Sequence, residues 1–206
     1  MGIRVKICGI TRYEDAKLAS GLGADALGFI FYSKSPRYIS PAKAREITRK
    51  LPPFIMRVGV FVDEDPNVVA QTIASAGLDA IQLHGSESPA YCAKFTCPVI
   101  KAFSVQPGFD ATALDAYDVS GFLLDTWDAK ARGGTGKTFD WVAAKALTLR
   151  RDNIILAGGL GPSNLAEALE IVRPYAVDLN SGVEVRPGEK NPQKLRDAIA
   201  IVKNWK

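Results

Sequence analysis

Short runs of mostly apolar residues recur along the whole chain, and the fold can be predicted from their spacing. Each run is four to six residues long, as is typical of a strand that is buried on both faces. The runs occupy residues 5–8, 26–31, 58–62, 80–84, 99–103, 122–125, 154–157 and 176–180. We expect all eight to be β-strands.

The segments between these runs show a helical period, with apolar residues every three or four positions. The clearest of them cover residues 41–51, 66–76, 140–149, 164–172 and 192–205. Asn191 and Pro192 supply a cap and a first residue for the last of these helices. Thr11 and Glu14 have the spacing of a capping box, so a further helix is predicted to start there. The helical pattern is weakest after the fourth and fifth runs.

Apolar strands that alternate with helices indicate a parallel sheet that is covered on its outside. Residues 23–28 and 77–82 repeat one unit, in which a glycine precedes Asp-Ala and a strand. Eight strand–helix units in 206 residues predict a closed (β/α)8 barrel, the TIM-barrel class of α/β fold, at the small end of its size range. No linker interrupts residues 1–206, so a single domain is expected. An open, doubly wound sheet is the alternative.

The composition narrows the possible partners. The chain is 47% hydrophobic, enough for a full core, and no apolar stretch reaches the roughly 18 residues of a membrane span. The net charge of +4 is mild, and the densest basic stretch, residues 43–50, alternates as a solvated helix face does. We therefore expect no nucleic-acid and no membrane partner, while the positive charge suits a small anionic substrate.

The cysteine count and the glycine motifs argue against bound cofactors. Three scattered cysteines are too few for a disulfide framework and indicate a reducing, cytoplasmic location. With one histidine and no cluster of ligands, a metal site is not expected. Residues 134–138 end like a P-loop, but Ala131 stands where its first glycine belongs, and Asn164 replaces the third glycine of a dinucleotide fingerprint.

In a barrel of this class, the functional site is built where strands end and the following loops begin. This rule selects six polar or reactive residues: Cys8, Arg37, Gln82, His84, Asp125 and Asp178. Asp125 directly follows an apolar strand, where a carboxylate is costly unless it faces a polar site. The alternatives are that Cys8 is only a small buried apolar residue, that Arg37 pairs with a surface carboxylate, and that His84 caps a strand.

Both of the last two predicted strands run into glycine-rich loops, at residues 158–161 and 180–184. Loops at these two places often bind phosphate in such barrels, because unpaired backbone N–H groups and a helix dipole favour an anion. The alternative is that the glycines serve only tight turns. The sequence thus predicts a phosphate site at these loops.

Eight ordered blocks of sequence, one at nearly every strand end, resemble phosphoribosylanthranilate isomerases. They are Lys6-Ile7-Cys8-Gly9-Ile10-Thr11, Ser35-Pro36-Arg37, Val60-Phe61-Val62, Gln82-Leu83-His84-Gly85, Leu123-Leu124-Asp125, Gly134-Thr135-Gly136-Lys137-Thr138-Phe139-Asp140-Trp141, Ala157-Gly158-Gly159-Leu160 and Ser181-Gly182-Val183-Glu184. The resemblance covers nearly the whole chain. Asn180 is a departure, because the family usually has a second serine there.

The resemblance implies an Amadori rearrangement of N-(5-phosphoribosyl)anthranilate, a phosphorylated aminosugar, on the way to tryptophan and without a cofactor. It implies that Asp125 is the general acid at the furanose oxygen and that Cys8 is the general base at C2. Asp125 would need surroundings that keep it protonated. Cys8 would need help to ionise, from Lys6, Arg37 or the helix after Thr11.

The rest of the implied site binds the substrate. Arg37 would hold the anthranilate carboxylate, for which a planar fork of donors is suited. The other expected contacts are Gly159, Ser181 and Gly182 at the phosphate, and Gln82, His84 and Asp178 elsewhere in the site. The oligomeric state stays open between a monomer and a homodimer.

Two rival functions remain on the sequence alone. A lyase similar to indole-glycerol-phosphate synthase would use a lysine and a glutamate at the strand ends, and Lys101 is available. A catalytically silent phosphosugar-binding barrel would keep the glycine loops but would not need a paired acid and base.

Overall fold

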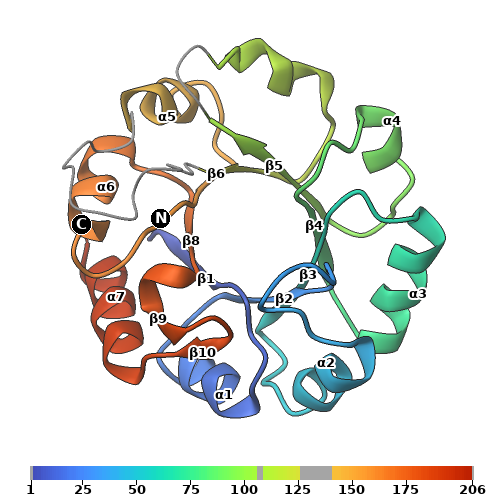
Figure 1. The fold of residues 1–206 in the computed structure, drawn as a ribbon. Coiled ribbons are helices and arrows are strands. Elements are labelled where there is room, and N and C mark those ends of the chain that lie inside the picture. Colours follow the sequence, from blue (N-terminus) through green and yellow to red (C-terminus); the bar gives the residue numbers. More distant parts are fainter. Residues whose placement is uncertain (1, 106–108, 126–140, 206) are drawn as a thin grey trace.

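Eight parallel strands close into a barrel in the computed structural model, which describes residues 2–105, 109–125 and 141–205 (Figure 1). The strands are β1 (Arg4–Ile7), β2 (Ala26–Ile30), β3 (Met56–Phe61), β4 (Ala80–Leu83), β5 (Val99–Ser104), β6 (Gly121–Asp125), β7 (Ile154–Leu156) and β8 (Ala176–Leu179). Each strand pairs with the next along the chain, and β8 returns to β1 with Val177 opposite Val5. The predicted closed barrel is confirmed, and the open sheet is excluded.

Helices surround the barrel on its outside (Figure 1). They are α1 (Tyr13–Gly21), α2 (Pro41–Thr48), α3 (Pro66–Ala76), α4 (Pro89–Cys92), α5 (Trp141–Thr148), α6 (Leu165–Val172) and α7 (Pro192–Asn204). Where the helical pattern is weakest, the structure has only the single turn of α4 and the 3-10 helix η1 (Ala111–Ala116). The cap predicted for the last helix is confirmed, because the Asn191 side chain accepts hydrogen bonds from Gln193 and Lys194.

The capping box predicted at Thr11 is wrong. Helix α1 begins at Tyr13, its N-cap is Arg12, and no side chain caps it. The Thr11 hydroxyl instead donates to the carbonyl of Gly188. Gly188 lies in a short hairpin of β9 (Glu184–Arg186) and β10 (Glu189–Lys190), which the pattern did not predict. A tertiary contact has therefore replaced the local one.

The aspartates of the two repeated Asp-Ala units make equivalent hydrogen bonds. Asp25 accepts hydrogen bonds from the Val5 amide at 2.8 Å and from the Arg4 guanidinium at 2.7 Å. Asp79 accepts from the amide and from Nε of Arg57, at 2.8 and 2.7 Å. Each aspartate thus fixes the start of one strand to the start of its neighbour.

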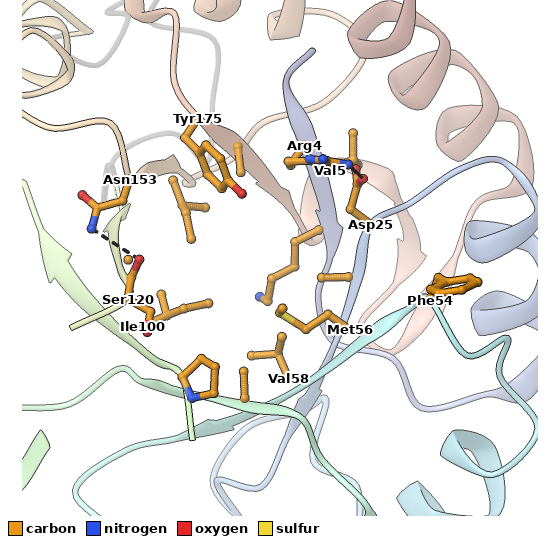
Figure 2. Close-up of a pocket in the computed structure, with 17 residues that line it drawn as sticks. Arg4, Val5, Asp25, Phe54, Met56, Val58, Ile100, Ser120, Asn153 and Tyr175 are labelled. Atoms are coloured by element: carbon orange, nitrogen blue, oxygen red, sulfur yellow. Dashed lines mark hydrogen bonds and ion pairs between the residues drawn. The ribbon is translucent and has the colours of Figure 1, made fainter. Parts of the chain in front are cut away.

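Small side chains leave a cavity of about 500 Å³ inside one end of the barrel (Figure 2). Its walls include the first residues of several strands, such as Arg4, Ala26, Met56, Ala80 and Ala176. The cavity therefore opens at the N-terminal ends of the strands. The loops that follow the strands, where the site was predicted, lie at the opposite end.

Candidate active site

Cys8 follows the end of β1 and lies near a buried ion pair. Lys6 Nζ is 2.8 Å from Asp178 Oδ2, and both side chains are almost fully buried. The Lys6 ammonium is also close enough to Cys8 for its charge to act on the thiol. Gly28 makes room for this group, since a Cβ there would stand 2.8 Å from Cys8 Sγ and 3.1 Å from Lys6 Nζ. The sequence identified Cys8 and Asp178, and the ion pair explains why Asp178 is tolerated inside the barrel.

The charges around Cys8 act in opposite directions. Burial raises the pKa of the Cys8 thiol, and the nearby Lys6 ammonium lowers it only in part, so that the pKa stays above its ordinary value. For Lys6, burial acts to lower the pKa, but Asp178 and Cys8 outweigh it and the pKa is raised. Lys6 therefore remains a cation beside a thiol that is mostly protonated in the empty site at neutral pH.

Asp125 is the last residue of β6. Of the other predicted residues, His84 contacts Asp125, and Gln82 contacts His84. His84 Nε2 lies 3.1 Å from Asp125 Oδ2, and Gln82 Nε2 lies 2.8 Å from His84 Nδ1. With Gln82 in this orientation, its amide nitrogen donates to Nδ1, which leaves Nε2 as the ring nitrogen whose proton faces Asp125. His84 thus donates to Asp125. The His84 side chain therefore contacts two other predicted site residues, which the alternative of a simple strand cap did not include.

Lys101, the lysine that a lyase would need, is occupied. Its Nζ donates to Glu87 Oε2 at 3.0 Å and to the carbonyls of Gly85 at 2.7 Å and Ala102 at 3.0 Å, and the lysine and Glu87 side chains are only 3% and 1% exposed. Glu87 in turn accepts from the amide of Gly85, which follows His84. The pair holds the loop after β4, and the ammonium group of Lys101 is already bonded to these partners.

Lys101→Met is expected to destabilise the protein by about 3–5 kcal/mol, because it leaves the buried Glu87 carboxylate without its cation. Urea unfolding measures this. Lys17→Met, at an exposed position on α1, is the matched control and should cost little. A Lys101→Met variant as stable as the control would show that the pair does not support the loop.

Arg37 follows β2 and forms a partly buried, bidentate pair with Glu184 that the sequence did not predict. Its Nε lies 3.0 Å from both carboxylate oxygens of Glu184, and its Nη2 lies 2.7 Å from Oε2. Lys190 Nζ approaches the same carboxylate at 2.9 Å. Burial acts to raise the pKa of Glu184, but the hydrogen bonds and charges of Arg37 and Lys190 outweigh it, and the pKa is lowered. Glu184 is only 6% exposed, so it is not the surface carboxylate considered from the sequence.

The two glycine loops touch each other through their backbones. A Cβ on Gly182 would overlap the carbonyl oxygen of Leu160, and one on Gly161 would stand 2.8 Å from the carbonyl oxygen of Gly182. Gly159 has a left-handed backbone with a φ of 61° and open space around it. The Gly161 amide already donates to Asn164 Oδ1 at 2.9 Å, so this amide is not available to an anion.

The residues around Ser181 complete this part of the site. Ser181 is exposed and begins the 3-10 helix η2 (Ser181–Val183) directly after β8. Asn180, the departure from the family pattern, is bound by Lys190, whose Nζ donates to its side-chain oxygen at 3.1 Å and to its carbonyl at 3.3 Å. The amide side chain is thus accommodated by a lysine from β10.

Within residues 2–105, 109–125 and 141–205, no group of three or more His, Cys, Asp or Glu residues is placed to hold a metal ion. In the same residues, no helix is long and apolar enough to cross a membrane. The predicted block 134–141 lies outside the described residues except for Trp141.

Comparisons with known proteins agree on one family. The family model described as N-(5'phosphoribosyl)anthranilate (PRA) isomerase matches residues 5–201. The N-(5'-phosphoribosyl)anthranilate isomerase of Citrifermentans bemidjiense is 52% identical over 203 residues, which cover 97% of each chain. A crystal structure of a phosphoribosyl anthranilate isomerase in complex with reduced 1-(o-carboxyphenylamino)-1-deoxyribulose 5-phosphate is 40% identical, with a TM-score of 0.82 over 98% of this chain and 100% of its own.

A second solved structure agrees. Monomers derived from the dimeric phosphoribosylanthranilate isomerase of Thermotoga maritima are 39% identical, with a TM-score of 0.84 over 98% of this chain and 100% of theirs. The sequence identity and the shared barrel extend from the first strand of the chain to its last helix. The chain belongs to the N-(5'-phosphoribosyl)anthranilate isomerase family.

Proposed function

We propose that the chain catalyses the Amadori rearrangement of N-(5-phosphoribosyl)anthranilate to 1-(2-carboxyphenylamino)-1-deoxyribulose 5-phosphate, in tryptophan biosynthesis, by general acid–base catalysis without a cofactor. The observation that carries the proposal is the pair of Cys8 and Asp125, which stand where β1 and β6 end on the same face of the barrel. A thiol and a carboxyl at two strand ends can reach different atoms of one bound sugar. A silent binding barrel has no need of them.

The reaction has two proton transfers that these residues would perform. Asp125 gives a proton to the furanose oxygen, the bond from C1 to this oxygen breaks, and a protonated Schiff base forms. Cys8, as the thiolate, then removes the proton from C2, and the electrons of that bond neutralise the Schiff base to give an enolamine. The enolamine becomes the ketone when C1 gains a proton and the hydroxyl on C2 loses one. His84, fixed by Gln82, orients Asp125 for the first step.

Turnover in the absence of any cofactor tests this proposal. The purified chain, treated with a metal chelator, should convert the substrate and abolish its anthranilate fluorescence, with the ketose as the only product. Binding of substrate without turnover would favour the silent barrel. Release of carbon dioxide from the ketose, supplied in place of the substrate, would favour the lyase.

The substrate's two anionic groups would be held at two places. Arg37 holds the anthranilate carboxylate, and the loops of Gly159, Ser181 and Gly182 hold the phosphate. Asp178 supports this site through Lys6 and Cys8. We further propose a cytoplasmic enzyme with a small-molecule substrate and no nucleic-acid partner, as a monomer or, like the Thermotoga maritima protein, a homodimer.

Arg37→Lys is expected to raise KM by roughly 10- to 100-fold with a smaller fall in kcat, because an ammonium cannot replace a bidentate pair with a carboxylate. Steady-state kinetics with the fluorescence assay measures both constants. Arg49→Lys, at an exposed position at the end of α2, is the control. An unchanged KM in Arg37→Lys would remove Arg37 from the binding site.

A further inference from the structure

The pair of Arg37 and Glu184 uses only one edge of the guanidinium group. Nε and Nη2 donate to the carboxylate of Glu184, while Nη1 has no hydrogen-bond partner among the residues that the structure describes. A guanidinium carries five N–H groups in one plane. With Glu184 on the Nε edge, the edge formed by Nη1 and Nη2 remains, and it has the spacing to bind a second carboxylate through two parallel bonds.

Glu184 holds the Arg37 side chain in one plane because Glu184 itself is fixed. Its side chain is 4% exposed, and it accepts from Lys190 Nζ at 2.9 Å and from the Gly188 amide at 3.2 Å. Arg37 also packs closely over Gly9, where an added Cβ would stand 2.8 Å from Arg37 Cδ. The flexible arginine is therefore held at its stem by Gly9 and at its head by Glu184.

The same residues connect Arg37 to the phosphate loop. Glu184 stands two residues after Gly182 in the chain. Lys190 bridges Glu184 and Asn180, the residues on either side of that loop, through bonds of 2.9 Å to Glu184 Oε1 and 3.1 Å to Asn180 Oδ1. The buried charges of Glu184 and Lys190 thus fix where the free edge of Arg37 lies relative to the phosphate loop.

We propose that Glu184 is a positioning residue that aims the free edge of Arg37, and that it thereby selects substrates whose aryl carboxylate lies at a set distance from the phosphate. The proposal rests on the function proposed above. Glu184 does not touch the substrate, because its carboxylate is taken by Arg37, Lys190 and Gly188. Its effect is on the recognition of the carboxylate and not on the recognition of the phosphate.

The test compares two ligands that differ only in the carboxylate. Titration calorimetry measures the affinity of each protein for the product and for the product's phenylamino analogue that lacks the carboxylate. The ratio of the two affinities reports how well the carboxylate is recognised. Glu184→Gln keeps the size of the side chain but has one acceptor oxygen in place of two, so Arg37 loses one of its parallel bonds. Glu170→Gln, on the exposed face of α6, is the matched control.

We expect Glu184→Gln to reduce the affinity ratio by roughly 10- to 100-fold, through weaker binding of the product, while the analogue and inorganic phosphate bind as in the wild type. Glu184→Asp, which keeps the charge but withdraws it by one methylene, should give a smaller reduction. An unchanged ratio would overturn the proposal. Equal losses for product, analogue and phosphate would also overturn it, since they would show that Glu184 only supports the fold.

The same experiment separates this proposal from the proposed reaction. Suppose that the wild type binds the product much more tightly than the analogue but does not convert the substrate. The proposed isomerase activity would then be wrong, while the comparison of the Glu184 variants would still decide the role of Glu184.

Discussion

Cys8→Ala and Asp125→Asn are each expected to lower kcat by about 10²- to 10⁴-fold, the usual contribution of a general base or acid. Neither side chain holds the two anionic groups of the substrate in the proposed site, so both variants should still bind product with nearly unchanged affinity. Steady-state kinetics and product titration measure the two effects separately. The loss should be in rate and not in binding.

The two other cysteines are the controls for this prediction. Cys92 is the buried last residue of α4 and Cys97 is partly buried, and neither stands at a strand end on the site's face. Cys92→Ala and Cys97→Ala should therefore remain active. If Cys8→Ala kept a kcat close to the wild type, the thiol would be only a packing residue, and the mechanism proposed here would have to be given up.

The residual activity of Asp125→Asn should rise with pH above neutral. Burial raises the pKa of Cys8, so the fraction of thiolate is small at neutral pH and grows as the pH increases. In the wild type this gain is offset by the loss of the proton from Asp125, but in Asp125→Asn there is no acid to lose. The profile of kcat/KM against pH should show this limb in Asp125→Asn, and the further substitution Cys97→Ala should keep it. A residual rate of Asp125→Asn that is already at its maximum on the acid side of neutral would mean that a thiolate of Cys8 is not the base.

Gly182→Ala is expected to raise KM by roughly 10- to 100-fold and to remove competitive inhibition by inorganic phosphate. A methyl group there would overlap the carbonyl oxygen of Leu160, which is backbone and cannot rotate away. The two loops would have to separate, at a cost of about 1–3 kcal/mol. The phosphate site proposed between them would then be lost.

Gly21→Ala is the matched control for this substitution. Gly21 is the last residue of α1, and a Cβ there would meet nothing within 4 Å. This variant should keep both KM and the inhibition by phosphate. If Gly182→Ala behaved like the control, the phosphate would have to bind elsewhere.

The barrel was predictable because its pattern is repeated and local. Eight apolar runs separated by helical segments leave few arrangements, and the sheet closes as expected. The features that the sequence did not predict correctly are either short or depend on residues far away in the chain. Thr11 lost its predicted cap to Gly188, and the hairpin of β9 and β10 is too short to give a period.

The same distinction applies to the candidate site. Cys8, Arg37 and Asp125 could be selected because they end strands or follow them. Glu184 and Lys190 were missed as functional residues, although Glu184 stands in a quoted motif, because the partner of Glu184 is Arg37, 147 residues earlier in the chain. A glutamate between two valines, directly after a glycine loop, is the signal in the sequence that could have indicated an unseen cation.

The most direct test of the proposed mechanism is a single-turnover measurement with a substrate that carries deuterium at C2. An excess of enzyme is mixed rapidly with this substrate or with the ordinary one, and the loss of anthranilate fluorescence is followed. If Cys8 removes the C2 proton in the step that limits the chemistry, the deuterated substrate should react several-fold more slowly. Equal rates for the two substrates in the wild type would contradict the account.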